Sequence, residues 1–167
     1  MVSSASDLSH VAIERVRHSD AETFLALIDA LADYEHLERP DNAARERLLR
    51  DGFGERPRYE AFLARIDGKA VGYAIIYETY SSFLALPTLY LEDIFVLPEA
   101  RGQKAGIALF LYVADIARAR GCGRMDWAVL DWNTLAQDFY DRLGAEWLKE
   151  WRLFRLTADD LARLPKP

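Results

Sequence analysis

Apolar and polar residues alternate along the chain in blocks that predict strands interleaved with helices. The segment "HVAIERVR" at 10–17 has the two-residue period of a half-buried strand. It is followed by "SDAE", in which Ser19 and Glu22 have the capping-box spacing, and by apolar residues at helical intervals. The pattern therefore predicts a strand and then a helix that runs to about Tyr34.

The middle of the chain predicts a second helix and a β-hairpin. The segment "DNAARERLLRDG" begins with two good helix-capping residues, Asp41 and Asn42, and closes with Gly52. Two apolar runs, at 59–66 and 69–80, are separated only by Asp-Gly, a dipeptide that favours the positive φ angles of a type I′ turn. We expect these runs to pair as antiparallel strands.

The rest of the chain continues the alternation of strands and helices. The expected elements are, in order, a strand at 88–97, a helix at 105–120, a strand at 124–130, a helix at 134–144, a strand at 146–156 and a short helix capped by Thr157. Apolar residues on nearly every side of the helix at 105–120 predict burial on most of its faces. The element order predicts an α/β (α+β) fold, in which a mixed sheet has helices on both faces.

Length and composition indicate one cytoplasmic domain. The 167 residues suffice for a single core, so we expect one domain over 10–167 after a disordered polar tail at 1–9. No apolar run is long enough to span a bilayer, and the N-terminus lacks a signal-peptide pattern. The single cysteine, Cys122, fits a reducing compartment. We therefore expect a cytoplasmic protein with no membrane partner.

Charge and histidine spacing argue against two further classes of ligand. A net charge of −6 disfavours nucleic acid, because its phosphates require a basic face. The three histidines, His10, His18 and His36, are not spaced with acids or with Cys122 as metal ligands are. We expect neither a nucleic-acid partner nor a bound metal.

The loop "RGQKAG" at 101–106 connects an apolar strand to an apolar helix. The first turn of a helix exposes unpaired N–H groups and carries partial positive charge, which favours phosphate. Gly102 and Gly106 let the backbone approach a ligand closely, and the two cations of the loop add charge. The P-loop pattern is absent, and "GFGERP" at 52–57 lacks the third glycine of a dinucleotide fingerprint. The loop therefore predicts a polyphosphate ligand.

Two motifs resemble those of the GNAT superfamily of acyl-CoA N-acyltransferases. They are the strand, loop and helix around 101–106, which resemble motif A, and "NTLAQDFYDRLGA" at 133–145. Segments between 10 and 164, among them "LADYE", "DGFGERPRY", "YETYSSF", "LYLEDIFV" and "EWRLFRL", are similar to the spermidine/spermine (diamine) N-acetyltransferase family. The resemblance implies a GNAT fold with a mixed, mostly antiparallel sheet, acetyl-CoA as co-substrate and a homodimer.

The resemblance also implies which residues contact acetyl-CoA. They are Ile94, Phe95 and Val96, whose backbone would pair with the pantetheine arm, the loop residues Arg101, Gly102, Gln103, Lys104, Ala105, Gly106 and Ile107, and Asn133 and Ala136. Lys104 departs from the motif, which usually has glycine there. We expect a helical conformation at Lys104, in which lysine costs nothing and adds a cation; a positive φ would cost on the order of 1 kcal/mol.

Two acids, Glu92 and Asp93, interrupt the apolar strand at 88–97. Neighbours in a strand point to opposite faces, so we do not expect a paired-carboxylate site, and a salt-bridged pair on a partly exposed strand is an alternative. The resemblance implies that both contact the acceptor amine and that Glu92 acts on its proton, directly or through water. It implies further acceptor contacts from Tyr34, Glu35, Phe83 and Trp127.

Tyr140, in "FYDRLG", has a spacing typical of a core residue, but the resemblance implies that its phenol protonates the departing CoA thiolate. The prediction is an acetyl-CoA-dependent N-acetyltransferase that acts by direct transfer on a primary amine. The acceptor would be a polyamine, a diamine or a lysine-like small molecule. Two alternatives are a non-catalytic CoA-binding regulatory dimer and a protein N-acetyltransferase.

Overall fold

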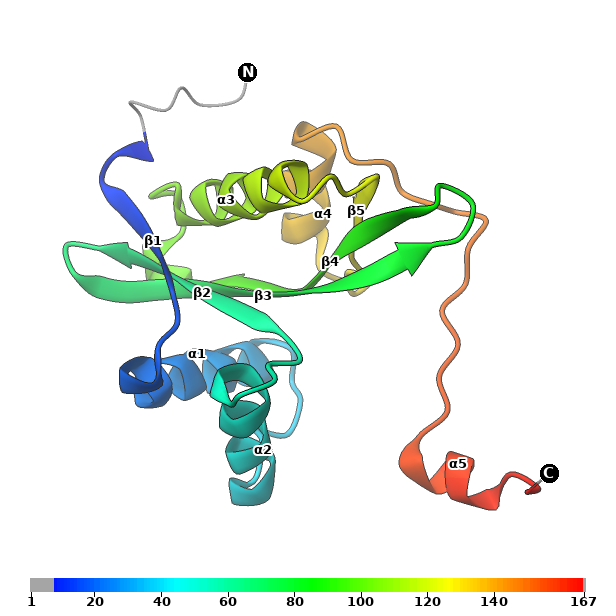
Figure 1. Cartoon of the computed structure of the whole chain (residues 1–167). Coiled ribbons are helices and arrows are strands. Elements are labelled where there is room, and N and C mark those ends of the chain that lie inside the picture. The colour runs from blue at the N-terminus through cyan, green and yellow to red at the C-terminus, as the bar shows by residue number, and fades with distance from the viewer. Residues whose placement is uncertain (1–7, 167) are drawn as a thin grey trace. The chain divides into compact units, whose positions relative to one another are not determined.

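The computed structural model describes residues 8–166, which fall into two compact units (Figure 1). The first unit ends at Ala128 and the second begins at Val129. Of the disordered tail predicted at 1–9, residues 1–7 lie outside the described residues, whereas Leu8 packs partly buried against the first unit's core. The single domain expected over 10–167 stays a prediction.

A five-stranded sheet in the order β1-β2-β3-β4-β5 forms the centre of the first unit. Its strands are β1 (Val11–Arg15), β2 (Glu60–Ile66), β3 (Lys69–Ser81), β4 (Leu86–Val96) and β5 (Arg124–Asp126). All neighbours are antiparallel except β5, which is parallel to β4. Asp67 and Gly68 have φ angles of 49° and 76°, which confirms the predicted hairpin turn. The sheet confirms the predicted fold class, although β5 is shorter than the run at 124–130.

Helices cover both faces of this sheet (Figure 1). On one face lie α1 (Ala21–Tyr34) and α2 (Asn42–Phe53), and on the other lies α3 (Ala105–Ala119). Two 3-10 turns, η2 (His18–Asp20) and η3 (Pro98–Ala100), come before α1 and α3 along the chain. The predicted helices at these positions are therefore confirmed.

Two helix ends differ from their predictions. Ser19 lies inside η2 rather than capping α1, because the backbone N–H of Arg17 donates to Asp20 Oδ2 at 3.0 Å and the chain coils one turn earlier. Gly52 lies inside α2, which continues to Phe53. The other end of α2 follows the sequence, since Asp41 accepts a 2.7 Å hydrogen bond from the N–H of Ala44.

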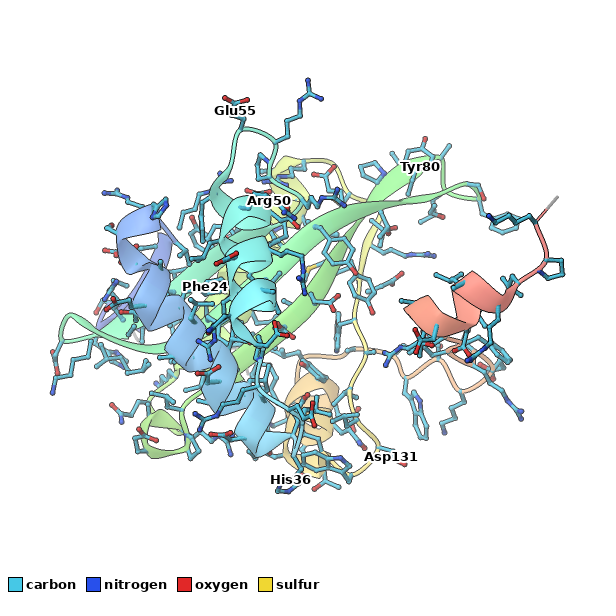
Figure 2. The ribbon with its side chains drawn as sticks, turned by 90° about the horizontal axis from the view of Figure 1, so that it is seen from below. Phe24, His36, Arg50, Glu55, Tyr80 and Asp131 are labelled. Atoms are coloured by element: carbon cyan, nitrogen blue, oxygen red, sulfur yellow. The ribbon has the colours of Figure 1, made fainter. Side chains whose placement is uncertain are left out.

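Each face of the sheet has its own apolar core. Figure 2 looks onto the face that α1 and α2 cross, where Phe24 stands edge-on to Phe53 and to Tyr73, with ring centres 6.0 and 5.6 Å apart. On the other face one stripe of α3 is buried, made of Ala105, Ala108, Leu109, Val113 and Ala117. Burial of α3 on most faces was therefore too broad a prediction, because a helix on an open sheet has neighbours on one side only.

The second unit contains α4 (Thr134–Arg142) and α5 (Ala158–Arg163). Asn133 and Thr157 cap them as predicted, by accepting hydrogen bonds from the N–H groups of Ala136 and Asp160 at 3.2 Å each. The strand predicted at 146–156 is wrong: this segment has no strand structure and its side chains are exposed. A strand needs a paired neighbour, and none of the described residues supplies one to this segment.

Candidate active site

A β-bulge in β4 turns two adjacent acids to the same face of the sheet. Ile75 of β3 pairs with Asp93 and Ile76 pairs with Leu91, so Glu92 is an extra residue with no partner on β3. Both acids then line one pocket on the α1/α2 face. The expectation that they point to opposite faces was wrong, because the two-residue period of a strand is interrupted at a bulge.

Tyrosines from β3 hold both carboxylates. The hydroxyl of Tyr77 donates to Glu92 Oε2 at 2.8 Å, and that of Tyr73 donates to Asp93 Oδ2 at 3.3 Å. Neither carboxylate forms a salt bridge with a described cation, which removes the salt-bridged alternative. Two negative groups are thus held side by side without a neutralising partner, an arrangement that favours binding of a cation.

Burial and like charge raise the pKa of Asp93 to about 6, where the burial of the carboxyl has the larger effect and Glu92 and Glu35 add to it. Burial also raises the pKa of Glu35, at the C-terminal end of α1. Three acids from α1 and β4 therefore share one region of negative potential. A positively charged ligand would lower these pKa values, so its binding and their ionisation support each other.

The pocket that holds the two acids has a volume of about 400 Å³. Its floor is formed by the β3 residues Ile75 and Tyr77 and its side by Leu48 of α2. Arg58 and Tyr59, from the loop between α2 and β2, complete the lining; Glu55 marks this loop in Figure 2. The pocket thus combines an apolar wall with charged groups on two different elements.

The end of α1 lies beside β4, as the resemblance implied for the acceptor region. The rings of Tyr34 and Phe95 have centres 6.0 Å apart, and the guanidinium of Arg101 lies 4.6 Å from the centre of the Tyr34 ring. The Nε of Arg101 also donates to the carbonyl of Val96 at 3.3 Å. Tyr34 and Glu35 are therefore brought to the same side of β4 as the acids, while Arg101 folds back onto that strand.

The second edge of β4 is unpaired beyond the bulge. β5 pairs with β4 only at Thr88, Leu89 and Tyr90, and no strand among the described residues pairs with this edge from 91 to 96. Backbone N–H and C=O groups along an open edge can bind an extended chain as a further strand would. The role predicted for Ile94, Phe95 and Val96 toward the pantetheine arm fits this edge and stays a prediction.

The loop at 101–106 has two residues in the left-handed region. Gly102 has a φ of 80°, which glycine adopts without strain. Lys104 has a φ of 66° and directly precedes α3, so the helical conformation expected there was wrong. The chain must turn sharply from η3 into α3, and the carbonyl of Lys104 accepts the first helical hydrogen bond, from Ala108 at 3.0 Å. A lysine in this conformation costs about 1 kcal/mol.

The start of α3 retains the features of an anion site. The N–H groups of Ala105, Gly106 and Ile107 precede the first helical donor, that of Ala108, and belong to the unpaired first turn. A ring nitrogen of His10 donates a hydrogen bond to the carbonyl of Gln103 at 3.0 Å, which links this loop to the residue before β1. The predicted contacts of these residues with the diphosphate of acetyl-CoA agree with this geometry and stay predictions.

In the second unit, Tyr140 is a buried residue of α4, with a relative exposure of 9%. Its ring lies against that of Phe139, with centres 5.4 Å apart, and burial raises the pKa of its hydroxyl to about 12. A phenol with such a pKa is protonated at neutral pH and can act as a donor. The N–H of Ala136 is held by the cap of the same helix.

Two predicted acceptor residues lie away from the acids. Phe83 is in the turn between β3 and β4 with its side chain 99% exposed. Trp127 packs against Phe110 on the α3 face, with ring centres 5.5 Å apart, whereas the acids line the opposite face. The sequence analysis did not identify Arg58 and Tyr77, which line the pocket with the two acids. Once the bulge at Glu92 is known, the two-residue period of β3 places Tyr77 on the same face of the sheet as the acids.

The part of the chain that the structure describes has neither a cluster of metal-ligating side chains nor a membrane-spanning helix. Within residues 8–166, no three histidine, cysteine, aspartate or glutamate side chains gather as metal ligands would. No helix in the same range is both long and apolar enough to cross a bilayer.

Comparison with known proteins identifies relatives that match part or most of the chain. The family model of the acetyltransferase (GNAT) family matches residues 15–145. The thialysine N-epsilon-acetyltransferase of Bos taurus is 38% identical over 168 residues, covering 94% of this chain and 98% of that protein. The L-ornithine N5-acetyltransferase NATA1 of Arabidopsis thaliana is 42% identical over 100 residues, which cover 60% of this chain and 44% of that protein.

Among solved structures, an integron cassette protein from the mobile metagenome of V. cholerae superimposes with a TM-score of 0.77 at 24% identity. The match covers 92% of this chain and 96% of that one, and it supports the fold alone. The family match spans most of the sequence, including the bulged strand, the loop at 101–106 and α4. The chain therefore belongs to the acetyltransferase (GNAT) family, which confirms the family resemblance, the fold and the amine acyltransferase class predicted from the sequence.

Proposed function

We propose that this protein transfers the acetyl group of acetyl-CoA to a primary amine of a polyamine, a diamine or a lysine-like amino acid. The observation that carries the proposal is the pair of acids at the β4 bulge, which line one pocket and form no salt bridge with a cation of the described residues. The names of the two relatives support a small amine as acceptor, since thialysine and ornithine both have a distal amino group.

The acids answer the main chemical difficulty of the reaction. An alkylammonium with a pKa of about 10.4 must lose its proton before the nitrogen can attack, which costs roughly 4–5 kcal/mol at neutral pH. Glu92 and Asp93 concentrate the ammonium form in the pocket, and Glu92, oriented by the hydroxyl of Tyr77, accepts the proton directly or through water. The neutral nitrogen then bonds to the thioester carbonyl carbon.

Tyr140 supplies the proton that completes the transfer. As the carbon–sulfur bond breaks, the thiolate leaves and takes the hydroxyl proton of Tyr140, whose raised pKa keeps it protonated until that moment. The newly bonded nitrogen releases its extra proton to the resulting tyrosinate, directly or through water, which leaves a neutral amide and restores the phenol. Backbone groups of the open β4 edge and of the first turn of α3 hold the pantetheine arm and the diphosphate, and an N–H of that edge stabilises the oxyanion.

A panel of amines tests this function. The protein is incubated with acetyl-CoA and one amine at a time, and the release of free CoA thiol is followed. We expect thiol release with at least one diamine or lysine-like amino acid. Binding of acetyl-CoA without release for any member of the panel would contradict the proposal and favour a regulatory CoA-binding protein.

Tyr140→Phe isolates the proton donor. This variant should lower kcat by about 10²-fold, because a general acid contributes at least that factor, while KM for the amine changes little. Tyr80→Phe is the matched control, since Tyr80 is 68% exposed near the end of β3. An unchanged kcat in Tyr140→Phe would remove the role of this phenol.

A homodimer and a cytoplasmic location complete the proposal. The segment 146–156 carries large apolar side chains that are 77% exposed or more, namely Trp147, Trp151, Leu153 and Phe154. Such a surface favours association with a second copy of the chain. A mass measurement in dilute solution should give twice the chain mass, and a monomer would contradict the dimer. The free thiol of Cys122 supports a reducing compartment.

A further inference from the structure

Arg58 is a cation in the acidic pocket that the proposed chemistry does not use. It lies in the loop between α2 and β2, and its backbone is fixed at both sides. The N–H of Arg58 donates to the carbonyl of Asp51 at 2.7 Å, and the hydroxyl of the next residue, Tyr59, donates to the carbonyl of Leu48 at 2.7 Å. These hydrogen bonds therefore hold the backbone of Arg58 beside the pocket that its side chain lines.

Among the described residues, the guanidinium of Arg58 has only a distant partner, Asp51. Its Nε is 4.0 Å from Asp51 Oδ1, beyond hydrogen-bond distance, and its side chain is 80% exposed. The carboxylate of Asp51 is already taken by Arg50, which donates to both of its oxygens, at 2.9 and 3.2 Å. The planar donor fork of Arg58 is thus available to a carboxylate ligand.

Arg58 and the two acids lie on opposite sides of β3. The pocket runs from the entrance of β2, next to Arg58, across Ile75 and Tyr77 of β3 to the bulge in β4. Two strand spacings separate the ends, which is about 10 Å between backbones. Among the described residues that line this pocket, Arg58 is the only cation.

This distribution of charge matches a long-chain α-amino acid. An extended lysine-like molecule spans about 7–8 Å from its carboxylate carbon to its terminal nitrogen, given bond lengths near 1.5 Å. Its ammonium would meet Glu92 and Asp93, its methylene chain would lie on Ile75 and Tyr77, and its carboxylate would reach the arginine. A diamine of the same length would instead place a second cation against Arg58.

We propose that Arg58 binds the α-carboxylate of the acceptor and makes this protein select lysine-like amino acids over diamines. The proposal rests on the proposed amine acetylation and adds a substrate class to it. Arg58 is a specificity residue here, because it binds the far end of the acceptor and not the reacting nitrogen.

Matched pairs of acceptors test the role of Arg58. The pairs are lysine with cadaverine and ornithine with putrescine, whose members differ by the α-carboxylate. The wild-type protein should have the higher kcat/KM for the amino acid of at least one pair. Arg58→Gln should lower kcat/KM for that amino acid by about 10-fold or more, mainly through KM, and should leave the value for the diamine unchanged or raise it. Arg58→Lys keeps the positive charge but loses the planar donor fork of arginine. Its kcat/KM for the amino acid should therefore lie between the values of the wild-type protein and of Arg58→Gln.

Arg56→Gln is the matched control, since Arg56 is exposed in the same loop and does not line the pocket. It should change neither acceptor's kinetics. An equal loss for both members of a pair in Arg58→Gln, or no loss for either, would overturn the role of Arg58. A wild-type preference for the diamines would also overturn it, yet would leave the proposed acetylation intact.

Equilibrium binding gives a readout that does not depend on turnover. Calorimetric titration with lysine should show weaker binding to Arg58→Gln than to the wild-type protein, and titration with cadaverine should not. If no amine is acetylated at all, the proposed function fails, and this titration still decides whether Arg58 binds the carboxylate.

Discussion

The two faces of the central sheet are built from the same strands but have opposite characters. On the α3 face, Leu89, Leu91 and Leu109 are at most 2% exposed and pack into a continuous apolar core. On the α1/α2 face, the same β4 strand presents Glu92 and Asp93 to a pocket. The difference between the faces depends on one extra residue in β4. Because of the bulge, both acids face the pocket, while the residues before and after them pack against α3.

The apolar face should respond to substitution mainly in stability. Leu109→Ala removes a fully buried side chain of α3 and should lower the free energy of unfolding by about 2–5 kcal/mol. Denaturant unfolding measures this loss, while kcat/KM measured well below the transition should be nearly unchanged. Leu84→Ala, at a position 47% exposed, should change stability by less than about 0.5 kcal/mol. A loss of catalysis in folded Leu109→Ala would weaken the contrast between the faces.

The acidic face should gain stability when one of its charges is removed. The pKa of Asp93 is raised from 3.8 to about 6, so its contribution to stability is complete below pH 4 and is lost as the pH rises through about 6. That shift corresponds to roughly 3 kcal/mol at neutral pH. Asp93→Asn should therefore stabilise the protein by about 1–3 kcal/mol at pH 7.5 and by little at pH 4.

Unfolding experiments at the two pH values check this prediction for Asp93. Asp138→Asn serves as a control for the loss of one carboxylate from an exposed helix position. Equal effects of Asp93→Asn at both pH values would contradict the raised pKa of Asp93 as the cause of the stabilisation.

A smaller effect is expected at the end of β4, where the chain turns into α3. Lys104→Gly should stabilise the protein by up to about 0.5 kcal/mol, because relief of about 1 kcal/mol of left-handed strain is partly offset by the entropy that glycine gains in the unfolded state. The same variant should raise KM for acetyl-CoA a few-fold, since a positive charge beside the anion site is lost. Thermal unfolding and acetyl-CoA saturation curves separate the two effects, and a destabilised variant would contradict the first.

Local sequence chemistry was sufficient for the elements that local interactions determine. Examples are the Asp67-Gly68 turn and the caps at Asp41 and Asn133, which follow from residues that act within a few positions of each other. The family resemblance added Glu92, Asp93, Tyr34 and Glu35, which the structure brings to one side of β4.

Other features could not be predicted from local sequence patterns or from the family resemblance. The bulge at Glu92 is a property of the register between β3 and β4, and no single strand reveals it. The φ of Lys104 is 66°, a conformation that lysine seldom adopts, so the residue type did not indicate it. The segment 146–156 has the apolar content of a strand, yet strand structure requires a neighbour that the described residues do not supply.

A double-mutant cycle of Glu92→Gln and Asp93→Asn tests most directly whether both acids bind one acceptor cation. Each single variant should lower kcat/KM for the preferred amine by about 10- to 100-fold, and the double variant should lose less than the product of the two, because both groups act on the same ammonium. An unchanged kcat/KM in Asp93→Asn, with the whole loss in Glu92→Gln, would show that the two carboxylates do not share a site and would contradict the account.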